Sequence, residues 1–152
     1  MNTDYLVRPF EEADRASVKG LGIPVVDWWH NQVLGASLHL VVVHKPTSEV
    51  VADLQIRDRG VPEPSRCEGQ CHLILHVAPA HRRQGVGGQL FDLAHSFAQT
   101  RNATTLYAAY RETPDAPAAS FLSKRGFQVL ERFYPSYLDL EAFNPSRFEE
   151  CI

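Results

Sequence analysis

The sequence lacks several features that would assign it to a large class of proteins at once. Its 152 residues contain no run of about 18 apolar residues, so we expect no membrane-spanning helix. The opening residues, Met1-Asn2-Thr3-Asp4, show no basic segment followed by an apolar one, so we expect no signal peptide. Internal repeats, low-complexity tracts and linkers are also missing. The simplest expectation is one domain that spans residues 1–152.

Cysteine is scarce, and neither sign of charge is in large excess. Cys67, Cys71 and Cys151 are odd in number and loosely spaced, which favours free thiols in a reducing cytoplasm. Cys67, Cys71, His72 and His76 do not have C-x-x-C spacing, and Cys71 and His72 point to opposite faces of a strand, so we expect no metal site. The net charge is −3 and the basic residues are scattered, so we expect no nucleic-acid partner.

Hydrophobic periodicity and turn residues divide the chain into strands and helices. Strands are expected at 5–10, 37–44, 49–57, 71–77, 104–110, 127–133 and 137–140. Helices are expected at 14–21, 27–34, 85–100 and from about Asp115 to Arg125, with Gly126 ending the last one. The third helix carries Val86, Leu90, Leu93, Ala94 and Phe97 on one face. Strand–helix–strand passages around the last two helices predict a partly parallel sheet with helices on both faces, an α/β (α+β) fold.

The turn between the 71–77 strand and the third helix combines glycines with arginines. Without a Cβ, glycine lets backbone N–H groups approach a ligand closely, and a helix N-terminus favours negative charge. Arg82 and Arg83 add two cations at the same place, so the turn predicts a phosphate or pyrophosphate site. It is not the dinucleotide fingerprint, because Leu90 stands at the third glycine position, and no Lys-Ser/Thr pair follows as in a P-loop.

The whole string, V-x-P-x-x-R-R-x-G-x-G from Val77 to Gly87, resembles the signature of the GNAT N-acetyltransferase superfamily. The resemblance implies a mixed, mostly antiparallel sheet of six or seven strands. It also implies an enzyme that transfers the acetyl group of acetyl-CoA to an amine by direct attack in a ternary complex. The pyrophosphate would be held by the loop residues Arg82, Arg83, Gln84, Gly85, Val86, Gly87 and Gly88. A small-molecule or peptide amine acceptor, a cytoplasmic location, and a monomer or homodimer are expected.

Further site residues follow from the same resemblance. In this fold the fourth strand separates from the fifth, and backbone groups at Leu75, His76 and Val77 would hold the pantetheine arm and polarise the thioester carbonyl. A general base is expected near that strand. His72 is the first candidate because the ordinary pKa of histidine, near 6.5, suits the role. Alternation of faces would hide either His72 or His76. Glu112 and Asp53 are carboxylate alternatives, and Cys71 stands where some members carry a Glu.

A second match lies at residues 118–127, which are similar to the family's N-x-x-A-x-x-F-Y-x-x-x-G-F motif. Phe121, Gly126 and Phe127 match it, and Asp115 stands where Asn is common, so Asp115 and Phe121 are expected to contact the cosubstrate. Leu122 replaces the Tyr that protonates the leaving thiolate in many members. The donor would then be solvent or another tyrosine, with Tyr134 as the preferred candidate beside Tyr110 and Tyr137. The alternative is an acyl-CoA-binding module with little turnover.

The expected acceptor region carries no recognised signature. The first two helices and the 57–70 loop would form it, and Trp28 and Trp29 would either line the acceptor pocket or serve as packing residues. Near the start of the chain, Arg8 follows Val7 and an Asp lies six residues after it, which resembles the opening of many family members.

Overall fold

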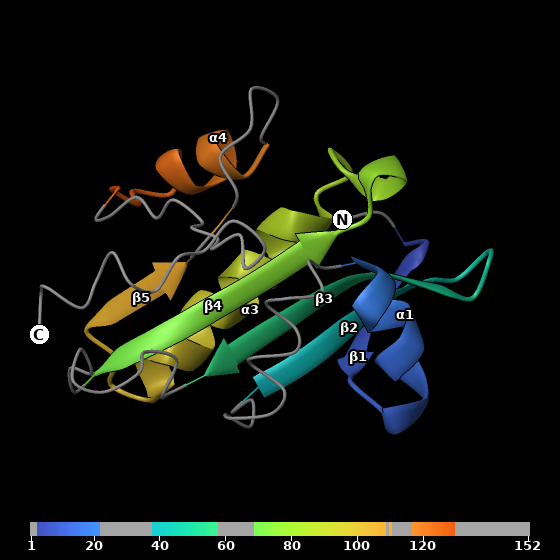
Figure 1. Ribbon diagram of the computed structural model, residues 1–152, viewed down its shortest axis with the longest axis horizontal. Helices are drawn as coiled ribbons and strands as arrows, with labels where there is room; N and C mark the ends of the chain where they lie inside the picture. The colour runs from blue at the N-terminus through green and yellow to red at the C-terminus, as the bar shows by residue number, and fades with distance from the viewer. Residues whose placement is uncertain (1–2, 22–37, 58–68, 109, 111–116, 130–152) are drawn as a thin grey trace, which may run out of the picture. The chain divides into compact units, whose positions relative to one another are not determined.

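The computed structural model describes residues 3–21, 38–57, 69–108, 110 and 117–129, and it divides into two compact units, 1–109 and 110–152 (Figure 1). The expectation of a single domain over residues 1–152 therefore stays a prediction. The described elements of the first unit are β1 (Tyr5–Pro9), η1 (Glu12–Asp14), α1 (Arg15–Leu21), β2 (Leu38–His44), β3 (Glu49–Arg57), β4 (Gln70–Val77), η2 (Pro79–His81), α3 (Val86–Thr100) and β5 (Thr105–Ala108). The second unit contains α4 (Pro117–Ser123).

The five strands of the first unit form one sheet in the order β1-β2-β3-β4-β5. Neighbours from β1 to β4 are antiparallel, and β4 pairs with β5 in parallel. The parallel pair requires a crossover, which α3 provides. The predicted fold class, a mixed and mostly antiparallel sheet with helices, is confirmed. Of the two further strands expected, 127–133 is described over 127–129 only, where no strand is assigned, and 137–140 lies outside the described residues.

One face of this sheet is apolar, and the other, which we call the polar face, carries the polar side chains together with Val41 and Ile74. The pairs Leu54–Leu75 and Ile56–Leu73 place their side chains on one face, because directly opposed residues of an antiparallel pair point the same way. α3 lies behind β4 in Figure 1 and covers this face with its buried residues Val86, Leu90, Ala94 and Ala98. Burial of a side chain such as Leu90 contributes about 1.5–3 kcal/mol to folding.

The amphipathic pattern of α3 is confirmed with one correction. Leu93, expected on the buried face, is 38% exposed, whereas Ala98 is buried at 6% exposure. Ala98 comes four residues after Ala94 and lies on the side of the helix that contacts the sheet. Leu93 comes three residues after Leu90 and is turned away from that side. None of the helices within the described ranges is long and apolar enough to cross a membrane.

The last helix ends as its sequence predicts. Gly126 has φ +85°, its amide donates to the Ser123 carbonyl, and the Phe127 amide donates to the Leu122 carbonyl. These two bonds form a Schellman motif, which satisfies carbonyls that have no intrahelical partner. Asp115, the expected first residue of this helix, lies outside the described residues, as do the helix expected at 27–34 with its two tryptophans and most of the 57–70 loop.

Candidate functional site

The turn between β4 and α3 is bent by two residues with left-handed backbone. Arg83 has φ +62° and Gly85 has φ +83°, and residues 82–85 are exposed. A positive φ at a non-glycine residue is sparsely populated and occurs often at ligand-binding turns. Gly87 and Gly88 lie within α3 and have no positive φ, so the turn itself does not need glycine there.

The amide groups of this turn make few hydrogen bonds to the described part of the chain. The first α3 amide that bonds to a carbonyl of the turn is Gln89, which donates to Gly85, and no side chain caps the helix. For Arg83 through Gly88, no amide donates a hydrogen bond to another described residue. Six successive N–H groups that have no partner among the described residues, at a positive helix end, are suited to bind an anion.

Hydrogen bonds to strands of the sheet hold the turn in place. The Arg82 Nε atom donates to the Val77 carbonyl at 3.0 Å, and the Ala78 amide donates to the Val51 carbonyl at 2.8 Å. The Tyr5 hydroxyl lies 3.0 Å from His81 Nδ1, which ties η2 to β1. The amides therefore belong to a loop that is anchored to three strands of the sheet, β1, β3 and β4.

β4 is paired on both sides over its first half. The described parallel ladder joins Gln70–Leu73 to Thr105–Ala108, and the ladder with β3 continues to Val77. Residue 109, which follows the last described pair with β5, lies outside the described residues. The predicted backbone-binding residues Leu75, His76 and Val77 lie on β4 after that pair, and their role stays a prediction.

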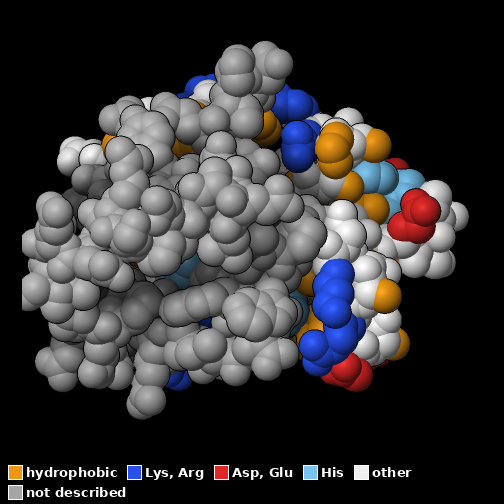
Figure 2. Space-filling view, in the orientation of Figure 1, with side chains coloured by type: hydrophobic (Ala, Val, Ile, Leu, Met, Phe, Trp, Pro, Cys, Tyr) orange, Lys and Arg blue, Asp and Glu red, His pale blue; other side chains and the backbone are white. Residues whose placement is uncertain are grey.

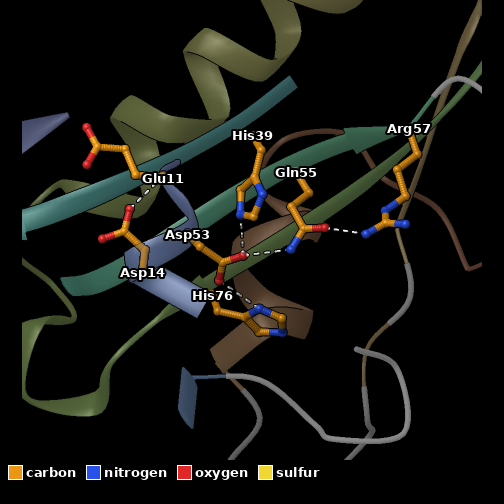
Figure 3. Close-up of polar contacts among 7 residues, drawn as sticks. All are labelled: Glu11, Asp14, His39, Asp53, Gln55, Arg57 and His76. Carbon is orange, nitrogen blue, oxygen red and sulfur yellow. Dashed lines mark hydrogen bonds and ion pairs between the residues drawn. The ribbon is translucent and has the colours of Figure 1, made fainter. Parts of the chain in front are cut away.

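The polar face of the sheet carries a buried hydrogen-bonded series along β3 (Figure 3). Asp53, Gln55 and Arg57 occupy alternate positions and are 0%, 3% and 2% exposed. Gln55 Nε2 donates to Asp53 Oδ2 at 3.1 Å, and Arg57 Nη2 donates to Gln55 Oε1. His76 Nδ1, from β4, lies 3.1 Å from Asp53 Oδ1. Both side-chain oxygens of the fully buried Asp53 therefore lie within hydrogen-bond distance of a side-chain nitrogen.

His39, from β2, also faces this carboxylate. Its Nε2 lies 3.8 Å from Asp53 Oδ2, and its ring stacks on Phe10 with centroids 4.1 Å apart. Burial lowers the pKa of His39, with Arg57 acting in the same direction and Asp53 and Asp14 opposing them. His39 is therefore neutral at pH 7 and adds no positive charge beside Asp53.

The predicted catalytic residues are only partly within the described chain. His72 is buried and packs edge-on against Tyr107 with centroids 5.7 Å apart. The expectation that alternation would hide His72 or His76 is wrong, because residues four apart in a strand share a face, and both lie on the polar one. Glu112 and Tyr134 lie outside the described residues, so their roles stay predictions.

Two residues of the polar series were not expected from the sequence. Gln55 and Arg57 follow Asp53 at alternate positions in a strand that is otherwise apolar, and this pattern marks them as facing away from Leu54 and Ile56.

Phe121, the expected cosubstrate contact of α4, has the Arg125 guanidinium 3.6 Å from its ring centroid. Within the described ranges, no three His, Cys, Asp or Glu side chains are placed to hold a metal ion.

Comparison with known proteins agrees with this geometry. The family model described as "Acetyltransferase (GNAT) domain" matches residues 35–129. The fold is similar to an aminoglycoside antibiotic 6′-N-acetyltransferase from Acinetobacter baumannii at 17% identity and a TM-score of 0.61, covering 90% of this chain and 99% of that one. It is also similar to a GNAT family acetyltransferase from Brucella melitensis in complex with acetyl-CoA, at 15% identity and a TM-score of 0.60, covering 84% and 85%. A comparison with curated proteins found no match.

Proposed function

The chain belongs to the GNAT acetyltransferase family, and from this premise we propose that it transfers the acetyl group of acetyl-CoA to an amine. The amine attacks the thioester directly while both substrates are bound. The acceptor is an amine of a small molecule or a peptide. We further infer that the protein works in the cytoplasm, without a metal, as a monomer or homodimer.

The observation that carries this proposal is the row of amides from Arg83 to Gly88. These N–H groups have no partner in the described chain, residues 83–85 are exposed, and the cations Arg82 and Arg83 belong to the same turn. A diphosphate supplies the acceptor oxygens and the negative charge that such a turn favours. The residues present therefore fit the pyrophosphate of coenzyme A.

The C-terminal half of β4, which leads into the turn, is the place that we propose for the pantetheine arm. An extended arm can lie along a strand edge and bond to its backbone, as an added strand would. Leu75, His76 and Val77 would supply those backbone groups. The thioester brings an activated acetyl group, and an N–H donor directed at its carbonyl oxygen would stabilise the charge that develops there.

Acetyl transfer also needs a base for the amine and a proton for the leaving sulfur. The base would come from the polar face of β4, where His72 and His76 both lie. Because Leu122 cannot donate a proton, we propose Tyr134 for the second task. A protein that bound acetyl-CoA without turnover would need neither group.

Titration calorimetry with acetyl-CoA tests the proposal. Gly87→Glu places a carboxylate among the amides, where it would repel the diphosphate. We expect the dissociation constant to rise at least tenfold, which is about 1.4 kcal/mol. The matched control is Gln99→Glu, which adds the same charge to an exposed position at the other end of α3 and should leave affinity within about twofold.

Two outcomes would contradict the proposal. If the wild-type protein does not bind acetyl-CoA, or if Gly87→Glu binds as tightly as Gln99→Glu, the turn is not a diphosphate site. Release of coenzyme A thiol in the presence of a panel of primary amines separates transfer from binding alone. Binding without sustained release on any amine would favour the acyl-CoA-binding module.

A further inference from the structure

We propose that Tyr5 is a positioning residue for coenzyme A, because its contact with His81 holds the turn before α3 in the conformation that binds the diphosphate. Tyr5 acts through His81 and η2 and does not itself contact the cosubstrate. The inference rests on the proposed function, since it names what keeps that site ordered. It is carried by a cluster of aromatic rings from Tyr5, His44 and His81.

The rings of this cluster come from separate elements. Tyr5 begins β1 and His44 ends β2, and the two residues are directly opposed in the antiparallel ladder, so their side chains lie on one face of the sheet. His81 is the last residue of η2. The ring centroids lie 5.4 Å apart for Tyr5 and His44, 5.8 Å apart for Tyr5 and His81, and 4.8 Å apart for the two histidines. Each ring therefore packs against the other two.

A hydrogen bond between side chains joins Tyr5 to η2. The Tyr5 hydroxyl lies 3.0 Å from His81 Nδ1. A tyrosine hydroxyl can donate or accept, so the contact persists whichever ring nitrogen of His81 carries the proton. The two rings meet edge to face, an arrangement that aromatic pairs favour. Tyr5 is 9% exposed, which limits the competition of water for this bond.

The backbone around Tyr5 is firmly attached to β2. Lys45, which follows β2, bonds twice to the residues before Tyr5. Its amide donates to the Asp4 carbonyl at 2.8 Å, and its Nζ atom donates to the Thr3 carbonyl at 2.6 Å. From Tyr5 onward, β1 pairs with β2 along its whole length. The Tyr5 ring is therefore a fixed point against which η2 can be held.

The residues after His81 form the diphosphate turn. Arg83 has φ +62°, and a non-glycine residue in this strained conformation persists where the surrounding structure holds it. η2 is one short turn that two backbone bonds close: the His81 amide donates to the Ala78 carbonyl at 2.9 Å, and the Arg82 amide donates to the Pro79 carbonyl at 3.3 Å. A fixed His81 ring therefore fixes the backbone that leads directly into the turn.

Two hydrogen bonds from neighbouring strands also hold this loop. The Ala78 amide bonds to a β3 carbonyl, and the Arg82 Nε atom bonds to the last carbonyl of β4. The contact between Tyr5 and His81 adds a third point of attachment, on β1. Two points leave a rotation about the line that joins them, whereas a third point removes it. Without the Tyr5 hydroxyl, η2 and the turn amides would be free to rotate about that line.

Tyr5→Phe removes the hydroxyl and keeps the ring. A turn that is ordered before the ligand arrives binds more tightly than one that must be ordered on binding. If only a fraction of the molecules presents the amides, the apparent dissociation constant rises by the inverse of that fraction. In titration calorimetry on the full chain we expect acetyl-CoA to bind about 3–10-fold more weakly to Tyr5→Phe than to wild type.

The matched control is Thr47→Val. The Thr47 hydroxyl also lies 3.0 Å from a histidine Nδ1 of the same cluster, that of His44, but it does not bond to η2. This variant therefore removes an equivalent hydrogen bond without releasing the turn. It should bind acetyl-CoA within about twofold of wild type.

Two substitutions of His81 test the other side of the contact. Leucine at this position fills space without bonding to the Tyr5 hydroxyl, so His81→Leu should bind about 3–10-fold more weakly. The amide of His81→Asn reaches the position of Nδ1 and should restore affinity to within about twofold of wild type. Asn and Leu are both uncharged, so charge does not distinguish them. Tyr5→Phe combined with His81→Leu should bind no more weakly than the weaker single variant, within about twofold.

¹⁵N relaxation dispersion on the ligand-free protein observes the turn directly. The amides of Gly85, Gly87 and Gly88 should show larger microsecond-to-millisecond exchange in Tyr5→Phe than in wild type or in Thr47→Val. Exchange that is equal in all three proteins would overturn the inference without any ligand. Circular dichroism under the same conditions checks that each variant is folded. If Tyr5→Phe does not fold, the comparison of His81→Leu with His81→Asn decides.

The binding results separate this inference from the proposed function. If wild type binds acetyl-CoA and Tyr5→Phe binds as tightly as Thr47→Val, the inference fails and the proposed function stands. If wild type does not bind acetyl-CoA, both fail. Additive losses in the double variant, or His81→Asn binding as weakly as His81→Leu, would show that the two residues act separately and would also overturn the inference.

Discussion

Asp14 illustrates how one buried carboxylate can be held by a single arginine and one backbone amide. Arg8 Nη1 donates to Asp14 Oδ2 at 2.7 Å and Arg8 Nη2 donates to Asp14 Oδ1 at 2.8 Å. The Glu11 amide adds a third bond at 2.8 Å. The hydrogen bond from Arg8 is the main reason that the pKa of Asp14 lies below its usual value, and burial acts against it. The pair joins β1 to η1, and its members are the Arg and the Asp six residues later that the sequence analysis noted.

Asp14→Asn should therefore destabilise the protein in a pH-dependent way. A carboxyl with a lowered pKa in the folded state contributes stability that is present above its unfolded pKa of about 3.9 and is lost as the pH falls through the folded value. At pH 7 we expect the free energy of unfolding in urea to fall by about 1.5–3 kcal/mol. Below about pH 4 the difference from wild type should shrink.

The matched control for this prediction is Asp92→Asn, at an exposed position of α3. It should change the unfolding free energy by no more than about 0.5 kcal/mol. An Asp14→Asn variant as stable as this control at pH 7, or a difference that grows toward low pH, would show that the Arg8 pair does not stabilise the fold.

At the scale of the element, the glycine in α1 and the glycine at the end of α4 differ in backbone conformation. Gly20 lies in α1 without a positive φ, and a Cβ there would meet no atom within 4 Å. Gly126 has φ +85° and equally open surroundings. A Cβ has room at both sites, so any difference in the effect of a substitution comes from backbone conformation.

The same substitution should then have opposite effects at the two sites. Gly20→Ala should raise the unfolding free energy by about 0.5–1 kcal/mol, because alanine loses less backbone entropy in a helix. Gly126→Ala should lower it by about 1 kcal/mol, because an L-residue is strained in the left-handed region. Urea unfolding followed by circular dichroism measures both. Changes of the same sign at the two sites would contradict this account of the α4 terminus.

At the scale of the whole molecule, a net charge of −3 opposes the binding of an anionic cosubstrate. In the turn before α3, the positive charges of Arg82 and Arg83 counteract that repulsion locally. On the face drawn in Figure 2, Lys and Arg side chains form separate groups and no continuous stripe covers the described surface. The attraction must therefore be local, and salt should screen it over a Debye length of about 10 Å at 0.1 M ionic strength.

Acetyl-CoA binding should accordingly weaken as salt is added, and Arg83 should account for part of that dependence. When NaCl is raised from about 0.05 M to about 0.5 M, we expect the dissociation constant to rise several-fold. Arg83→Gln should bind more weakly at low salt and show a shallower dependence. Lys19→Gln, which removes the same charge from exposed α1, should match wild type. Identical salt dependence in Arg83→Gln and wild type would exclude a role for that side chain.

Much of the architecture was determined by the sequence alone, because it depends on short-range patterns. Short runs of apolar and β-branched residues between turn residues predicted β1 to β5, and the 3.6-residue period predicted α3. The turn before α3 was identified from Arg82, Gly85 and Gly87, since glycine and arginine at a strand-to-helix junction have a local physical meaning. The family followed from the same residues.

The pairing of distant residues was decided by the tertiary structure. Asp53 and His76 are 23 positions apart, and nothing in either strand says which residue of β4 faces Asp53. Alternation assigns a side chain to a face but leaves the register open, and a shift of one residue would move His76 to the apolar side. The same holds for the described β4–β5 pairs, such as His72 with Tyr107, which join two strands on either side of α3. Local patterns therefore specify the elements, and long-range packing specifies which polar groups meet.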